Sequence, residues 1–174
     1  MRYALAWGDK VSPEFRMKVV EICKDFGWKY EYGSWLMACM AFESGETFSP
    51  TVKNGAGSGA VGLIQFMPGT AKALGTSVDE LRSMTAVEQL EYVRQYFKPF
   101  ALKIRSLSDM YMAILLPRYI GLDDASVLFE NSIAYAQNRG LDLNRDGRVT
   151  KAEATHKVAA KLERGRAFPA IVDW

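Results

Sequence analysis

A single glutamate that ends an apolar segment is the residue of this chain best suited to acid chemistry. Residues 35–42 are apolar throughout, and Glu43 follows them directly. A carboxylate is costly to bury, so we expect the pKa of this group to rise and the proton to stay on at neutral pH. Such a carboxyl group can protonate the bridging oxygen of a glycosidic bond. The C-terminus of a helix disfavours negative charge, which argues against a role in stabilising the helix.

A second segment, about twenty residues later, carries an amide in an unusual place. Residues 62–68 read Gly-Leu-Ile-Gln-Phe-Met-Pro. An unpaired amide within an apolar run would be expensive, so Gln65 needs a partner. We interpret it as a substrate-facing amide presented by a tightly turned backbone.

These two segments resemble the first two motifs of the soluble lytic transglycosylase and goose-type lysozyme family, which includes phage endolysins that cut peptidoglycan. The first motif is matched by Glu43, Ser44, Phe48 and Pro50. The second motif is matched by Gly59, Ala60, Gly62, Leu63, Ile64, Gln65, Phe66, Met67, Pro68, Thr70 and Ala71. The two motifs come in the family's order, and the resemblance covers roughly residues 35 to 140.

The resemblance implies cleavage of the β-1,4 bond between N-acetylmuramic acid and N-acetylglucosamine. Glu43 would first donate its proton to the bridging oxygen. The substrate's own N-acetyl group would stabilise the cationic centre at the muramyl C1. Glu43 would then take the proton of the C6 hydroxyl, and a 1,6-anhydro ring would close.

The scarcity of further acids bears on which product forms. Most glycosidases place a second carboxylate near the first. Here the next acid is Glu46, three residues on, and no aspartate occurs after Glu43 until Asp79. This favours the transglycosylase route. The alternatives are a hydrolytic muramidase, with Glu46 or a distant acid as its base, and an inactive calcium-stabilised module that binds sugar.

The expected substrate contacts come from the same motifs and from a weaker third one. They are Gln65, Ser44, Tyr135, Phe66, Met67 and Asn138. Ala134 and Tyr135 match the start of the family's Ala-Tyr-Asn motif, whereas the asparagine comes late, as Asn138. Tyr135 either orients Glu43, contacts the sugar or serves the structure. Phe66 and Met67 either line the groove or pack in the core. A serine common in the second motif is replaced by Ala56, with Asn54 or Ser58 as candidate substitutes.

A twelve-residue pattern near the C-terminal end matches a calcium-binding loop of the EF-hand type. Residues 142–153 place ligand oxygens at Asp142, Asn144, Asp146, Thr150 and Glu153, with the carbonyl of Arg148 as a further ligand. Gly147 occupies the sixth position, where the chain must turn sharply. Thr150 and Glu153 also form the pattern of a helix capping box, which is the competing interpretation. Any calcium ion here is expected to be structural, and we expect the chemistry to need no cofactor.

Composition narrows the class of protein. The 174 residues carry a net charge of +2, which gives no indication of nucleic-acid binding. Cys23 and Cys39 lie in apolar stretches and are expected as buried thiols. No apolar run is long enough to span a membrane, and residues 1–8 do not form a signal peptide. We therefore expect a monomer made in the host cytoplasm, as a phage lysin or particle-borne enzyme, that reaches the cell wall when a separate protein opens the membrane.

The pattern predicts one mainly helical, lysozyme-like domain over residues 1–174, with little β structure. Helices are expected from Pro13 to a stop at Gly27, over 35–42 after a cap at Ser34, over 68–74, after the capping boxes that begin at Ser77 and Thr85, from Ser108 to about Pro117, over about 125–138 and over about 151–164. Residues 45–62 are rich in Gly, Ser, Thr and Asn and are expected to form a loop or short hairpin. These elements must bring the two motifs together.

Overall fold

The computed structural model describes residues 1–53, 55 and 57–174. Its α-helices are α1 (Pro13–Asp25), α2 (Glu31–Glu43), α3 (Pro68–Ala73), α4 (Val78–Ser83), α5 (Ala86–Phe97), α6 (Leu107–Leu115), α7 (Ile133–Asn138) and α8 (Lys151–Gly165). Its strands are β1 (Arg2–Leu5), β2 (Val127–Glu130), β3 (Arg148–Thr150) and β4 (Ala170–Asp173). Short 3-10 turns cover Gly8–Lys10, Ala101–Lys103, Pro117–Tyr119 and Arg139–Leu141. The expectation of a mainly helical, lysozyme-like fold is confirmed.

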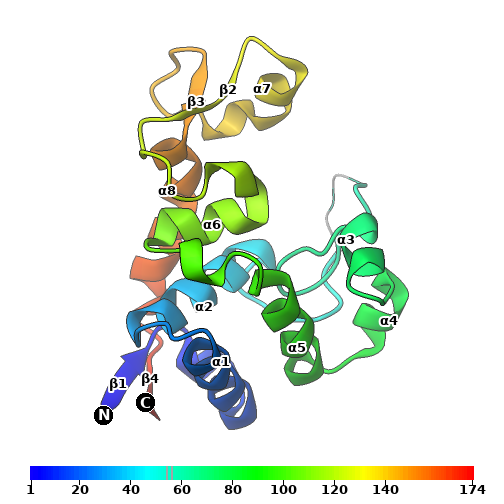
Figure 1. Ribbon diagram of the computed structural model, residues 1–174, viewed down its shortest axis with the longest axis vertical. Coiled ribbons are helices and arrows are strands. Elements are labelled where there is room, and N and C mark those ends of the chain that lie inside the picture. Colours follow the sequence, from blue (N-terminus) through cyan, green and yellow to red (C-terminus); the bar gives the residue numbers. More distant parts are fainter. Residues whose placement is uncertain (54, 56) are drawn as a thin grey trace.

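Helix α2 is the centre of the core because it is apolar on every side. Its residues from Leu36 to Ala41 are fully buried. Helices α1, α6 and α8 and strand β1 all pack against it, as Figure 1 shows. Cys39 of this helix and Cys23 of α1 are both buried free thiols, as expected.

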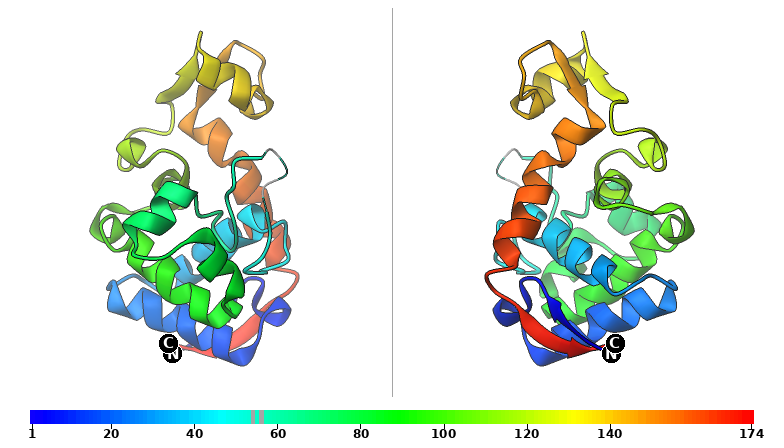
Figure 2. Two further views of the ribbon diagram at one scale, coloured as in Figure 1. Left: turned by 90° about the vertical axis from the view of Figure 1, so that its right-hand side faces the viewer. Right: turned by 90° about the vertical axis from the view of Figure 1, so that its left-hand side faces the viewer.

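Among the described residues, two small antiparallel sheets lie at opposite ends of the molecule (Figures 1 and 2). Strand β1 pairs with β4, from Arg2 opposite Asp173 to Leu5 opposite Ala170, which brings the two chain ends together. Strand β2 pairs with β3 at the far end of α8, where α7 also lies. The sheet of β2 and β3 uses residues from the calcium-type loop.

Several local predictions hold because their signals are local. Ser12 caps α1, and Ser77 and Thr85 form the expected capping boxes of α4 and α5. Helix α5 ends at Phe97, two residues before Pro99. The capping predictions rest on neighbouring residues alone, which is why they transfer directly to the fold.

Other predicted elements are wrong. The helix expected over 125–138 is strand β2 followed by the shorter α7, because pairing with β3 stabilises an extended conformation that local pattern does not reveal. Helix α6 is capped by Ser106 rather than begun by Ser108. Helix α2 begins at Glu31, and the Ser34 hydroxyl accepts a hydrogen bond from the Ala6 amide. By contrast, the loop expected over residues 45–62 is present in its described part, where the strand pairing is limited to isolated bridges that include Lys53 with Val61.

Candidate active site

Glu43 is the last residue of α2 and is only partly exposed. Burial raises its pKa from the ordinary value of 4.5 to about 7. Burial, and then the nearby Glu43 carboxylate, raise the pKa of Tyr96 to about 12. The same two causes raise the pKa values of Tyr111 and of Cys39. A carboxyl group with this pKa is half protonated near neutral pH and can serve as an acid and then as a base.

Tyr96 of α5 and Tyr111 of α6 lie close enough to Glu43 for its charge to affect them. Tyr96 donates a hydrogen bond to the carbonyl of Ala113 on α6. Tyr111 is buried, and its ring stands edge-on to Phe42 with centroids 5.7 Å apart. Sequence reasoning missed both residues because each lies on the apolar face of its helix, where an aromatic side chain usually indicates core. The available signal was the phenol itself, since a buried tyrosine hydroxyl needs a polar neighbour.

The turn that follows the acid uses Ser44 for structure. Ser44 is 1% exposed, and its hydroxyl accepts a hydrogen bond from the Phe48 amide at 2.9 Å. The Thr47 hydroxyl donates to the Ser44 carbonyl at 2.7 Å. The Ser44 side chain is thus buried and already paired within the turn, and its contact with substrate stays a prediction.

The second motif forms a tight loop between Val61 and Phe66, whose backbones exchange hydrogen bonds of 3.1 and 2.8 Å. Gln65 has a φ of +55°, and its side-chain nitrogen donates to the carbonyls of Val52 and Gly62 at 3.1 and 3.0 Å. The amide thus has the partners that its apolar setting requires. The side-chain nitrogen of Gln65 stabilises the loop through these two hydrogen bonds, and the contact of Gln65 with substrate stays a prediction.

The two apolar residues that follow Gln65 differ in their exposure to solvent. Phe66 is 1% exposed and packs edge-on to Tyr96, so of the two predicted roles the core role applies. Met67 is 47% exposed and lies on the surface beside it. The predicted positions Ala56 and Asn54 lie outside the described residues. The Ser58 hydroxyl accepts a hydrogen bond from the Ala60 amide.

Gln89 of α5 fastens this loop to the helix. Its side-chain oxygen accepts from the Leu63 amide at 2.8 Å, and its nitrogen donates to the carbonyls of Leu81 and Pro50 at 2.9 and 3.1 Å. A Cβ atom on Gly62 would lie 2.3 Å from the Gln89 oxygen, so only glycine fits there. Sequence reasoning did not single out Gln89. Its signal was a polar residue next to the inward-facing Leu90, because a helix buries such a side chain only if it is paired.

Glu46, the acid nearest to Glu43 in sequence, is paired with two cations. Its carboxylate forms ion pairs with Lys161 and Arg164 of α8. Hydrogen bonds from Lys161 and then from Arg164, opposed by partial burial, hold the pKa of Glu46 below its usual range. A carboxylate stabilised in this way is a weak base.

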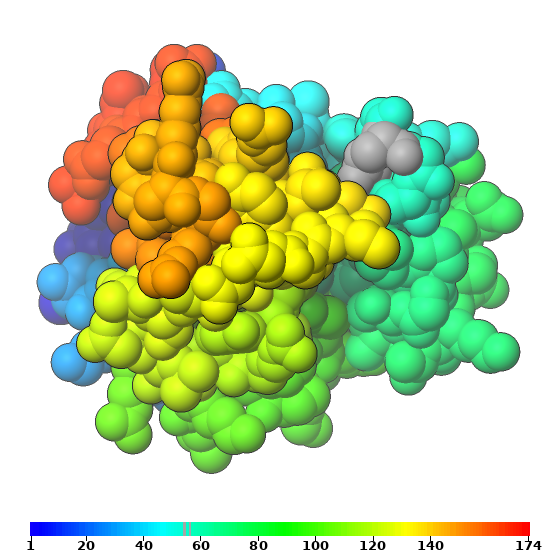
Figure 3. Space-filling view, turned by 90° about the horizontal axis from the view of Figure 1, so that it is seen from above, coloured from blue at the N-terminus to red at the C-terminus, as the bar shows by residue number. Residues whose placement is uncertain are grey.

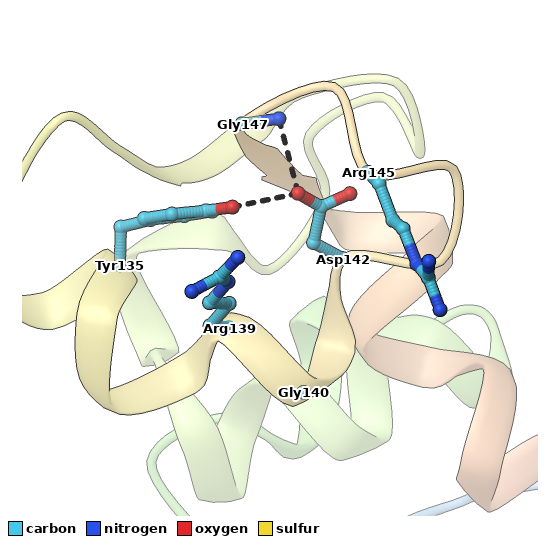
Figure 4. Close-up of a pocket in the computed structure, with 6 residues that line it drawn as sticks. All are labelled: Tyr135, Arg139, Gly140, Asp142, Arg145 and Gly147. Atoms are coloured by element: carbon cyan, nitrogen blue, oxygen red, sulfur yellow. Dashed lines mark hydrogen bonds between the residues drawn. The ribbon is translucent and has the colours of Figure 1, made fainter.

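Tyr135 and Asn138 lie in a different part of the molecule, on α7. The Tyr135 hydroxyl donates to Asp142 Oδ2 at 2.7 Å, as Figure 4 shows, and the Gly147 amide donates to the same oxygen at 3.0 Å. Asn138 donates to the carbonyl of Ala134 in its own helix. The structure thus pairs Tyr135 with the calcium-type loop, whereas Tyr96 and Tyr111 are the tyrosines that the Glu43 charge affects.

The backbone of the calcium-type loop, residues 142–153, turns at the glycine in the sixth position, as its sequence pattern predicts. Gly147 has a φ of +88°, β3 covers the seventh to ninth positions, and α8 starts at the tenth. Asn144 accepts from the Asp146 amide, and Asp146 from the Arg148 amide, both at 2.9 Å. The capping box is also present, since the Glu153 carboxylate accepts from Thr150. Over residues 1–53, 55 and 57–174, no three acidic, histidine or cysteine side chains are gathered to hold a metal ion.

Seen from above, the segment around residues 130–140 and the segment around residues 60–75 face each other across a depression of the surface (Figure 3).

None of the helices in the described ranges has the length and apolar character that crossing a bilayer requires. Comparison with curated proteins gave no match, and comparison with solved structures gave none. A comparison with family models matched residues 28–96, a stretch that runs from before α2 into α5 and carries Glu43, Gln65 and Gln89. This part of the chain is similar to the family described as the transglycosylase SLT domain, whose members act on peptidoglycan.

Proposed function

We propose that this protein is a lytic transglycosylase that cleaves the β-1,4 bond between N-acetylmuramic acid and N-acetylglucosamine in peptidoglycan. One observation carries the proposal: within the matched segment, Glu43 is a largely buried carboxyl whose burial raises its pKa to about 7. Such a group holds a proton to donate at neutral pH and can take one back afterwards.

In the first half of the proposed reaction, the Glu43 carboxyl gives its proton to the bridging oxygen as the bond from the muramyl C1 to that oxygen breaks. N-acetylglucosamine leaves with a free 4-hydroxyl. The carbonyl oxygen of the muramyl N-acetyl group bonds to C1 and shares the positive charge. Gln65 would accept a hydrogen bond from an acetamide N–H through its side-chain carbonyl, since its nitrogen is engaged by the loop.

In the second half, the Glu43 carboxylate removes the proton of the C6 hydroxyl, and O6 bonds to C1 as the acetamide oxygen leaves. Glu43 ends protonated, ready for another cycle. The state of Glu46 supports this route over hydrolysis, because its pairing with Lys161 and Arg164 leaves it a poor base to activate water.

Mass spectrometry of muropeptides released from purified sacculi tests the proposal. The anhydro product is lighter by one water than the product of a muramidase, so the two enzymes are separated in one measurement. A zymogram of the wild type beside Glu43→Gln supplies the control. Clearing by the wild type alone supports the role of Glu43, and no clearing by either protein would instead support a sugar-binding module.

A structural calcium ion held by residues 142–153 is part of the proposal. The Asp142 Oδ1 atom is buried without a hydrogen-bond partner among the described residues, which is costly unless a cation or water meets it. Asp142, Asn144, Asp146, the Arg148 carbonyl, Thr150 and Glu153 would hold the ion, and Glu153 would have to turn from its cap toward it. The oxygen-only donor set suits calcium. Its role would be stability, with no part in the chemistry.

Thermal melting tests the calcium proposal without measuring activity. We expect calcium to raise the melting temperature of the wild type relative to chelator, because an ion that binds only the folded state stabilises it. Asp146→Asn, an exposed position that loses one ligand charge, should reduce the rise. An unchanged melting temperature in the wild type would rule out a bound structural ion.

The biological setting that we propose is a phage lysin or particle-borne enzyme that acts on the cell wall. The resemblance to phage endolysins supports it. Expression in bacteria with and without a membrane-opening protein tests it, since a lysin of this kind should lyse the cells only when the membrane is opened.

A further inference from the structure

The turn directly after the acid has an unfavourable backbone. Gly45, Glu46 and Phe48 have φ angles of +62°, +66° and +49°. Glycine adopts such angles readily, whereas glutamate and phenylalanine do so only when their surroundings hold them there. Glu43 leaves α2 immediately before this turn, so the path of the turn decides where the carboxyl group points.

Glu46 is tied at both its backbone and its side chain. Its amide donates to the Ala41 carbonyl at 2.7 Å, which caps the end of α2. Its carboxylate is paired with Lys161, and Arg164 Nε lies 2.9 and 3.1 Å from the two carboxylate oxygens. The two cations stand one turn apart on α8, an element more than a hundred residues away in sequence.

The same region of α8 also holds the other end of the turn. The Phe48 ring packs against Trp7 and Phe15, with centroids 6.1 Å apart in each pair. The Trp7 indole donates to the Lys161 carbonyl at 2.9 Å, and the Arg164 guanidinium lies 5.9 Å from the Trp7 ring centre. The turn thus packs on one surface made by α8 and the Trp7 segment.

The choice of residue at position 46 is informative. Asparagine or glycine would adopt a φ of +66° with less strain than glutamate. Glutamate at this position costs conformational stability, but its side chain is long enough for the carboxylate to reach both cations. Partly exposed ion pairs add little to stability in general, so stability alone does not account for this choice.

We infer that Glu46 is a positioning residue, whose ion pairs with Lys161 and Arg164 hold the turn of residues 44–48 against α8 and thereby fix the direction of the Glu43 carboxyl group. The inference rests on the proposed role of Glu43 as the acid. It differs from the muramidase alternative, in which Glu46 itself is the base: here Glu46 never meets substrate or water of reaction.

Glu46→Asn separates positioning from stability. The variant relieves backbone strain and removes both ion pairs, so its melting temperature should equal or exceed that of the wild type. Its kcat on purified sacculi should fall by about tenfold or more at unchanged KM, because a displacement of about 1 Å can reduce a rate by about a hundredfold. The matched control is Glu163→Gln, which removes the exposed ion pair between this residue of α8 and Arg166 and should keep the wild-type kcat. Wild-type kcat in Glu46→Asn would overturn the inference.

A second measurement tests the positioning role of Glu46 even if the wild type shows no activity on peptidoglycan. The carboxyl carbon of Glu43 is titrated by NMR in the wild type and in the double variant Lys161→Met with Arg164→Met. Cys39 of the same helix, Tyr96 of α5 and Tyr111 of α6 adjoin Glu43 and have raised pKa values, so none of them titrates in this range.

The two explanations of the double variant predict opposite signs. Loss of two positive charges alone would raise the pKa of Glu43, whereas release of the turn would let water reach the carboxyl and lower it. We expect the pKa to fall toward 4.5. An unchanged or raised pKa would refute the positioning role. An inactive wild type whose Glu43 pKa falls in the double variant would refute the proposed function alone.

Discussion

Replacing Glu43 by glutamine should abolish activity and stabilise the protein at the same time, in a way that depends on pH. The pKa of Glu43 is about 7 in the folded chain and near 4.5 once the chain unfolds. Below pH 4.5 both states hold the proton, and the group adds nothing to the pH dependence. Between pH 4.5 and 7 the unfolded state releases its proton first, so stability falls as pH rises. Above pH 7 both states are ionised and the loss is complete.

The size of this loss follows from the pKa difference. A rise from 4.5 to about 7 corresponds to about 3 kcal/mol of unfolding free energy, as an upper value. Glutamine occupies the same space without a charge. Glu43→Gln should therefore match the wild type at pH 4 and exceed it by up to about 3 kcal/mol at pH 8. For a chain of this size that difference raises the melting temperature by roughly 6 to 12 °C.

Urea denaturation of both proteins from pH 4 to 8.5 measures the effect, with Glu163→Gln as the control for loss of an exposed carboxylate. The control should follow the wild type at every pH. If Glu43→Gln and the wild type differ by the same amount at pH 4 and pH 8, Glu43 is not a buried acid with a raised pKa. The reasoning about its chemistry would then fail as well, because it rests on the same property.

Three further predictions test other parts of the protein. The rate of muropeptide release should decline as pH rises through about 7, because the acid then loses its proton; a rate that stays constant up to pH 9 would contradict this. Gly62→Ala should lower the free energy of unfolding by about 2 kcal/mol or more in urea denaturation, because the new Cβ atom meets the Gln89 side chain. Gly57→Ala is the control: Gly57 has a similar φ angle but open space around it, so this variant should lose less stability. Lys151 of α8 and Asp109 of α6 form a buried ion pair, with Nζ 2.6 Å from Oδ1. Lys151→Met should cost about 3 to 5 kcal/mol, because it leaves the Asp109 carboxylate buried without its partner. Adding Asp109→Asn should recover part of that loss, and equal stability of the single and double variants would argue against the pair.

Much of the helical framework could be predicted from sequence because its signals are short in range. A serine or threonine followed three residues later by glutamate satisfies the first amides of a helix wherever it occurs, so the starts of α4, α5 and α8 were predictable. The apolar run before Glu43 likewise indicated a buried helix. The same reasoning failed for residues 127–130, which are a strand because β3, some twenty residues later, offers them a partner.

The candidate site divides in the same manner. Sequence singled out Glu43 and Gln65. It left the role of Phe66 open and did not predict that Ser44 is buried, because exposure depends on which elements pack around a residue. It did not find Gln89, Tyr96 or Tyr111, whose roles arise only where α5 and α6 meet α2 and the loop. The contact of Tyr135 with Asp142 was equally invisible in a motif of neighbouring letters.

The sequence by itself determined that this chain is a mainly helical protein with an acid at the end of an apolar helix and a calcium-type loop near its end. Both follow from residue type and spacing, which local chemistry fixes. The tertiary structure decided that Glu46 is held by two cations of α8 and that the acid adjoins two tyrosines. These facts depend on distant segments meeting in space, because burial and ion pairing arise only when the chain is folded.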